Sequence, residues 1–153
     1  MIAHTETVAG RHGAVADAIV RSWRNVDVDA GRGAEALYTV DGTFVTPAMS
    51  LTGRAEIAAG HKARTAGSPR LSRHVVSNMI IEIDADTAGA MYTLTVYSAD
   101  GTPPLELKGA SAVCDLFDTM RYVDGAWLIA RREIVPVFVA PHNDSVMLRG
   151  VAP

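Results

Sequence analysis

The second half of the chain consists of four long runs rich in β-branched and aromatic residues, which fit the pleated surface of a sheet. Turn sequences at 84–86, 100–104 and 124–125, rich in Asp, Gly and Pro, separate the runs. Short connections of this kind join antiparallel strands, because a parallel pair needs a much longer crossover. We therefore predict an antiparallel meander with strands at residues 72–83, 88–98, 105–122 and 126–138.

The first half is predicted to be mainly helical. Over residues 14–27, Ile19, Trp23 and Asp27 recur at four-residue spacing and so share one face of a helix. A short helix at 34–38, a strand at 43–46 and a third helix at 54–66 follow, the last with Glu56 in its first turn. The chain is thus expected to be an α+β protein, with N-terminal helices packed on a curved antiparallel sheet around one apolar pocket.

The length of 153 residues is enough for one core, so we expect a single domain over 1–153, with its core at about 14–138. The tail at 139–153 is expected to lie over the surface.

Several strands are apolar on both faces, and only one face can line the pocket. We therefore expect a homodimer or homotrimer.

Composition narrows the possible partners. The net charge is −3, and Lys and Arg are scattered, so neither nucleic acid nor an anionic membrane is an expected partner. No apolar run reaches the roughly 20 residues that cross a bilayer. A lone Cys114 and an N-terminus without a signal sequence indicate a cytoplasmic protein whose one thiol is an inert core residue.

Two residues stand out as candidates for acid–base chemistry. Asp27 ends the apolar stripe of its helix, where a carboxylate must be paired or reach water. His74 shares a strand face with Val76 and Asn78, and such a histidine is either a core residue with its hydrogen bonds satisfied or a base. An imidazole facing a carboxylate across a pocket makes an oriented base. Asn78 would then hold a substrate oxygen.

Four aromatic residues are candidates for the pocket wall, because they combine flat apolar surfaces with polar tips: Trp23, Tyr38, Tyr92 and Tyr97. The small hydrophobic substrate that they suggest is a ring compound.

No cofactor is expected. The sequence contains no phosphate-binding glycine loop, no nucleophile elbow and no pair of histidines at metal-binding spacing. His4, His12, His61 and His142 lie in unrelated segments, which argues against a metal site.

Several segments together form a familiar pattern: the helix ending at Asp27, the stretches 36–44, 53–57 and 73–78, and the strand pair from Phe117 to Arg132. In their order and spacing, the chain resembles the SnoaL-like branch of the nuclear transport factor 2-like superfamily. The resemblance implies a cone-shaped α+β barrel whose bent sheet wraps a pocket capped by helices. Members include scytalone dehydratase, bile acid 7α-dehydratase, ketosteroid isomerase, polyketide cyclases and non-catalytic dioxygenase β subunits, so the fold alone does not give the function.

In the dehydratase-like members a helix Asp pairs with a strand His, and these roles carry over onto Asp27 and His74. One position departs from the pattern, because Ser22 stands where dehydratases commonly have a Tyr. The resemblance implies a cofactor-independent lyase or isomerase that acts on an oxygenated ring compound. A polyketide cyclase, with Asp118 as a possible alternative base, and a non-catalytic binding module or partner subunit remain the alternatives.

Overall fold

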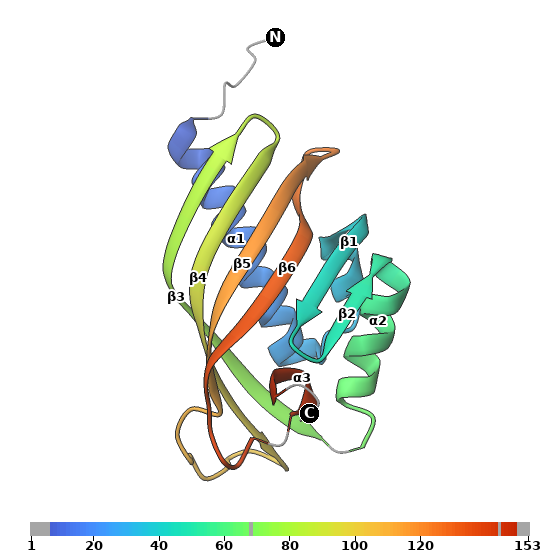
Figure 1. Ribbon diagram of the computed structural model, residues 1–153, viewed down its shortest axis with the longest axis vertical. Coiled ribbons are helices and arrows are strands. Elements are labelled where there is room, and N and C mark those ends of the chain that lie inside the picture. The colour runs from blue at the N-terminus through green and yellow to red at the C-terminus, as the bar shows by residue number, and fades with distance from the viewer. Residues whose placement is uncertain (1–6, 68, 144, 150–153) are drawn as a thin grey trace.

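A computed structural model describes residues 7–67, 69–143 and 145–149 of the chain (Figure 1). The N-terminal residues with His4 and the last four residues of the tail lie outside this part. The elements, in chain order, are α1 (Val8–Asp29), the 3₁₀ helix η1 (Ala34–Leu37), β1 (Tyr38–Thr46), β2 (Met49–Thr52), α2 (Gly53–Arg64), β3 (Arg70–Asp84), β4 (Thr87–Asp100), β5 (Ala112–Val123), β6 (Ala126–Val139) and α3 (Val146–Arg149). None of the described helices is long and apolar enough to cross a membrane.

The six strands form one sheet in the order β2-β1-β6-β5-β4-β3. The predicted meander is confirmed, since β3 to β6 pair antiparallel with their neighbours along the chain. The sheet as a whole is mixed, because β1, which precedes the meander, pairs parallel with β6. These two strands are far apart in the sequence, so no short turn constrains their direction. The α+β class is confirmed, and the sheet is open with β2 and β3 at its edges.

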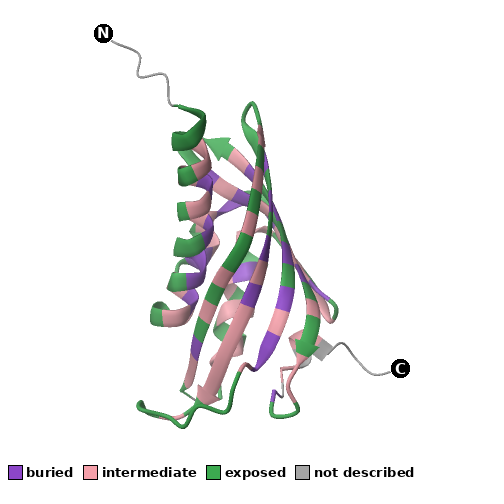
Figure 2. Cartoon of the chain, turned by 90° about the vertical axis from the view of Figure 1, so that its left-hand side faces the viewer, coloured by how far each residue is buried: buried purple, intermediate pink, exposed green. Residues whose placement is uncertain are grey.

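Helix α1 lies across one face of the sheet and buries the stripe that the sequence predicts (Figure 2). Val15, Ile19, Trp23 and Val26 are all buried and belong to a single core cluster with side chains from the strands. The Thr7 hydroxyl accepts a hydrogen bond from the Gly10 amide at 3.1 Å and so caps the helix start. The helix therefore begins six residues before the predicted start at residue 14, at Val8.

Two predicted strands have different bounds in the structure. The first strand is longer than residues 43–46, and it pairs with the short strand β2, which the sequence analysis missed. The strand predicted at 105–122 begins only at Ala112. Gly109 has a φ of 87°, a left-handed conformation that a regular strand does not contain, and the residues before it form an exposed loop.

The described part of the C-terminal tail, residues 140–143 and 145–149, contributes to the core. Asn143 is buried, and its side-chain amide donates to the carbonyl of Ser111 at 3.1 Å. Met147 and Leu148, in α3, pack against the core. These residues line the pocket, so the prediction of a tail that lies over the surface is wrong for this part of it.

A β-bulge interrupts β3 beyond His74. The pairing with β4 shifts between Ser77 and Ile80, and Asn78 adopts a left-handed φ of 52°. Because the bulge adds a residue to one strand only, the alternation of faces changes there. Asn78 is exposed and does not share the inward face of His74, contrary to the sequence prediction.

The sheet face opposite the core carries exposed apolar side chains from four strands. They are Val75, Ile80, Met91, Phe117, Val135, Val137 and Phe138. Apolar positions on both faces of the sheet, expected from the sequence, are therefore present.

The positive φ of Asn78 at the bulge leads to a prediction about stability. Asn tolerates a positive φ better than most residues, Gly adopts it freely, and a β-branched residue does not. Asn78→Val is expected to lower the free energy of unfolding by about 1–2 kcal/mol, whereas Asn78→Gly stays within about 1 kcal/mol of wild type. Urea denaturation measures both values. A valine variant as stable as wild type would contradict the bulge geometry.

Candidate active site

Asp27 and His74 form a hydrogen-bonded dyad. The Nδ1 atom of His74 lies 2.6 Å from Oδ1 of Asp27, and the backbone amide of His74 donates to Oδ2 at 2.9 Å. The side chain of His74 is only 8% exposed and that of Asp27 only 4%. Helix α1 supplies the carboxylate at the end of its buried stripe, and β3 supplies the imidazole on its inward face.

The dyad fixes the orientation of the imidazole. An ionised carboxylate only accepts hydrogen bonds, so Nδ1 of His74 carries the proton that is shared with Asp27. No hydrogen bond to Nε2 occurs among the described residues, and this nitrogen keeps its lone pair. The indole of Trp23 stacks on the ring, with 4.8 Å between centroids and an angle of 22° between planes.

Ser72 and Arg64 extend the hydrogen-bond network of the dyad. The hydroxyl of Ser72 donates to Oδ1 of Asp27 at 3.0 Å, and it accepts a hydrogen bond from Arg64 at 2.8 Å. Asp27 therefore receives hydrogen bonds on both oxygens from neighbouring groups. This set of contacts holds the carboxylate in one rotamer behind the imidazole.

The environment favours an ionised carboxyl group beside a neutral imidazole. Burial lowers the pKa of His74 and outweighs the raising effect of Asp27, and the charges of Arg64 and Arg132 lower it further. Burial alone would raise the pKa of Asp27, but the hydrogen bonds from His74 and Ser72 lower it overall. The imidazole is consequently available as a base near neutral pH.

His74 faces a largely apolar cavity with a volume of about 100 Å³. Every layer of the fold contributes to its wall, including α1, α2, all six strands and the C-terminal segment. The lining residues include Trp23, Val26, Phe44, Met49, Leu51, Ile57, His61, Arg64, Arg70, Leu94, Val96, Ser98, Cys114, Ile134, Asn143, Met147 and Leu148.

His61, on α2, is a second imidazole in the same cavity. Burial and the charge of Arg64 lower its pKa to about 4, so it is neutral at physiological pH. Its position depends on Gly31, because a Cβ atom there would lie 2.6 Å from Nδ1 of His61. Glycine at this left-handed position (φ 78°) gives the ring the space it occupies.

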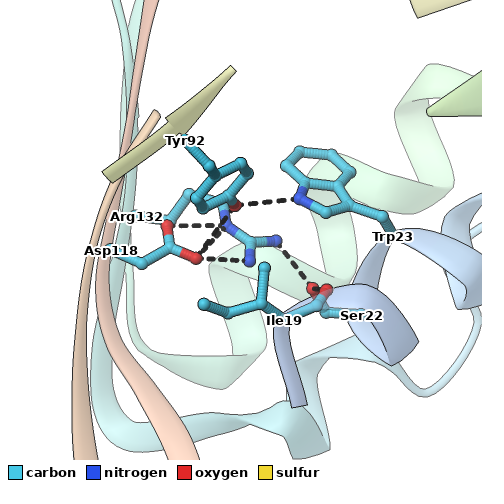
Figure 3. Close-up of polar contacts among 6 residues, drawn as sticks. All are labelled: Ile19, Ser22, Trp23, Tyr92, Asp118 and Arg132. Carbon is cyan, nitrogen blue, oxygen red and sulfur yellow. Dashed lines mark hydrogen bonds and ion pairs between the residues drawn. The ribbon is translucent and has the colours of Figure 1, made fainter. Parts of the chain in front are cut away.

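Arg132 and Asp118 form a buried ion pair (Figure 3). Nε of Arg132 donates to Oδ1 of Asp118 at 2.9 Å, and a second nitrogen donates to Oδ2 at 2.6 Å. The remaining terminal nitrogen donates to the Ser22 hydroxyl at 2.9 Å, and that hydroxyl donates to the carbonyl of Ile19. Burial opposes the charge of Arg132, but Asp118 holds its pKa above the ordinary value.

Trp23 connects the ion pair to the dyad. Its indole N–H donates to the hydroxyl of Tyr92 at 2.9 Å, and Tyr92 donates to Asp118 at 3.0 Å. The guanidinium carbon of Arg132 lies 4.3 Å from the centroid of the Trp23 ring. The ring that stacks on His74 is therefore held in place by the ion pair.

The structure separates the residues that the sequence grouped around the pocket. Trp23 lines the cavity, as expected. Tyr38 and Tyr92 are buried beside the ion pair, and burial raises the pKa of Tyr38 to about 12 and that of Tyr92 well above its usual value. Tyr97 belongs to the opposite side of β4 and lines a second hollow under the loop at 105–109.

Two further expectations need correction. Asn78 is exposed at the bulge and is absent from the cavity wall. Asp118 is occupied by Arg132 and Tyr92 and does not line the cavity, so it is not placed to act as an alternative base. Ser22, at the position of the missing tyrosine, points to Arg132.

Sequence analysis missed His61 and Arg64. The spacing of Ile57, His61 and Arg64 is i, i+4, i+7, which places all three on one side of α2, and Ile57 is buried. This spacing is the sequence signal that could have identified His61 and Arg64.

Among the described residues, no group of three His, Cys, Asp or Glu side chains could hold a metal ion. Cys114 is buried, and burial raises the pKa of its thiol to about 11.

Comparisons with known proteins agree with this architecture. A family model for the SnoaL-like domain matches residues 9–133. A candidate scytalone dehydratase from Novosphingobium aromaticivorans superposes with a TM-score of 0.76 at 19% identity, covering 94% of this chain and 95% of that one. ActVI-ORFA from Streptomyces coelicolor gives 0.73 at 20% identity, covering 84% and 98%.

A candidate dehydratase of the NTF2-like family from Streptomyces avermitilis gives a TM-score of 0.73 at 16% identity, with coverage of 87% and 100%. No curated protein sequence matches the chain. At these identities the structural matches establish the fold.

The depressed pKa of His61 predicts a loss of stability in acid. The unfolded chain takes up a proton at this histidine near pH 6.5, whereas the folded chain resists until about pH 4. Stability is therefore complete above pH 6.5 and falls between pH 6.5 and 4, by on the order of 2–3 kcal/mol from this group. His61→Gln should show a shallower fall in urea titrations at pH 7.5 and 4.5. His74 contributes in the same direction, so some slope remains; an unchanged slope would contradict the assignment.

The buried ion pair makes a second prediction. Asp118→Asn leaves the charge of Arg132 without its partner and should lower the free energy of unfolding by about 3–5 kcal/mol. The double variant Asp118→Leu with Arg132→Met removes both charges and should recover most of that loss. Chemical denaturation compares the three proteins. A single variant that loses less than about 1 kcal/mol would show that the pair is unimportant.

Proposed function

The chain belongs to the SnoaL-like domain family, and we propose that it is a cofactor-independent lyase or isomerase that works by general acid–base catalysis. Its substrate would be a small, apolar, oxygenated ring compound of the polyketide, steroid-like or terpenoid kind. The observation that carries the proposal is the His74–Asp27 dyad, whose free Nε2 belongs to a ring that lines an apolar cavity.

In the proposed reaction, Nε2 of His74 removes a proton from a carbon next to a carbonyl group. The electron pair of that C–H bond moves into the carbonyl to form an enolate, and Asp27 stabilises the imidazolium through Nδ1–H. In a dehydration the enolate expels a β-hydroxyl group, which leaves as water with the proton from Nε2. In an isomerisation the same proton returns to another carbon of the ring system.

The enolate oxygen needs a hydrogen-bond donor in the cavity. We assign this role to His61, because a neutral imidazole in an apolar site donates through its N–H without carrying charge. Its low pKa, about 4, keeps it in that form at neutral pH. Tyr38 and Tyr92 are already engaged around the ion pair.

The alternative of a non-catalytic module predicts a pocket filled by side chains and an Asp27 and a His74 that do not meet. The cavity and the 2.6 Å contact favour an enzyme instead. A polyketide cyclase would begin with the same proton abstraction and is therefore a variant of the same chemistry at this site.

Proton exchange tests the proposal without knowledge of the natural substrate. A set of cyclic ketones, such as 2-tetralone, is incubated with the protein in D₂O, and NMR follows exchange at the carbon next to the carbonyl group. His74→Ala should lower the enzymatic exchange rate by about 10²–10⁴-fold. Asp27→Asn should also lower it, and the double variant should be little worse than the worse single one.

Asn78→Gly is the matched control for these variants, since Asn78 lies on the same strand but outside the cavity and glycine tolerates its positive φ, and its rate should equal that of wild type. EDTA should leave the rate unchanged. Exchange at wild-type rates in a folded His74→Ala variant would refute the proposed base.

We also propose that the chain forms a homodimer or homotrimer through the exposed apolar face of its sheet. Seven exposed apolar side chains on four neighbouring strands are costly to leave in water. Multi-angle light scattering at micromolar concentration should give a mass two or three times 16.2 kDa. Phe117→Asp, a change at the centre of that face, should shift the protein towards monomer, and a wild-type monomer would contradict the proposal.

A further inference from the structure

Arg64 is the cation in the cavity wall whose hydrogen-bonding capacity is least used. It ends α2, its side chain is half-buried, and a terminal nitrogen donates to the hydroxyl of Ser72. A guanidinium has five N–H donors in a fixed planar fork. No other hydrogen bond from Arg64 occurs within the described part of the chain, so donors remain for a ligand.

The cavity wall is short of negative charge. Its described lining contains the cations Arg64 and Arg70 but no Asp or Glu. Asp27 lies behind His74, and its oxygens are taken by Ser72 and by the ring and backbone N–H of His74. Of the other carboxylates near the cavity, Asp118 is neutralised by Arg132, and Glu35, whose charge acts on His61, is not part of the lining. The pKa of Arg64 reflects this shortage, since burial and Arg70 lower it more than Asp27 raises it.

From this arrangement we infer that the cavity takes a ring compound that carries a carboxylate group, and that Arg64 binds the carboxylate. The planar fork of an arginine matches the two oxygens of a carboxylate, and such charge-assisted pairs are stronger than neutral hydrogen bonds. The apolar remainder of the wall would receive the ring. The inference deepens the proposed function and rests on it for the link to turnover, because it names the charged group that would orient the ring relative to His74.

Ligand binding tests the inference independently of catalysis. Benzoate and benzamide have the same ring and nearly the same shape, but only benzoate is charged. Each is titrated into ¹⁵N-labelled protein, and NMR follows the indole N–H of Trp23 in the cavity wall. Trp127, which does not line the cavity, provides the reference signal.

Wild type should bind benzoate about 10- to 100-fold more tightly than benzamide. Arg64→Met should bind the two equally, and Arg64→Lys should keep only a reduced preference, because lysine retains the charge but not the fork. Arg73→Met is the matched control, since it removes a charge from the exposed side of the neighbouring strand β3. It should retain the full preference.

Equal binding of the two probes to wild type would overturn the inference, whether or not the Arg64 variants fold. A preference that persists in a folded Arg64→Met variant would overturn it as well. His74→Ala should still prefer benzoate while losing proton exchange. Failure of the proposed base and failure of the carboxylate site therefore give different results.

Discussion

The ion pair between Arg132 and Asp118 positions the pocket. Both side chains are almost completely buried, and each has several hydrogen bonds that compensate for the loss of water. Through Ser22 the pair is attached to α1, and through Tyr92 it is attached to the indole of Trp23. Because Trp23 stacks on His74, the orientation of the proposed base depends on two charges that do not line the cavity.

In the candidate site, the negatively charged group and the proposed base are different residues. Asp27 has a lowered pKa and lies behind the imidazole, outside the cavity lining, and in the proposed mechanism it orients His74 and stabilises the imidazolium. His74 and His61 both have pKa values lowered first by burial, so two neutral rings line an apolar space. Arg64 adds a positive charge to the same wall. A ligand would therefore meet one basic nitrogen, one neutral donor and the cations Arg64 and Arg70 in a largely apolar cavity.

Much of this arrangement could be predicted from periodicity, because helices and strands repeat regularly. The four-residue spacing from Ile19 to Asp27 identified the carboxylate, and the alternation along β3 placed His74 on the inward face. The same alternation failed at Asn78, since a bulge adds one residue without a recognisable turn sequence. Tyr97 failed for a simpler reason. It is five residues from Tyr92, and an odd separation in a regular strand means opposite faces.

Periodicity along the chain could not predict features that depend on contacts between distant segments. The parallel pairing of β1 with β6 joins parts of the chain some 90 residues apart, and nothing local specifies its direction. The buried ion pair needs Asp118 and Arg132 to face inward on neighbouring strands, which depends on the register across an irregular pairing. The entry of the C-terminal segment into the cavity wall likewise follows from tertiary packing, with Asn143 bonded to Ser111.

The proposed chemistry requires His74 to be a neutral base whose Nδ1 proton is held by Asp27. Long-range ¹H–¹⁵N correlation NMR of histidine-labelled protein measures this directly, because the two ring nitrogens have different shifts in each tautomer. At pH 7.5 we expect an Nδ1–H tautomer for His74 that protonates only below the ordinary histidine pKa of 6.5, and Asp27→Asn should disturb that tautomer. An Nε2–H tautomer, or a ring already protonated at pH 7.5, would contradict it.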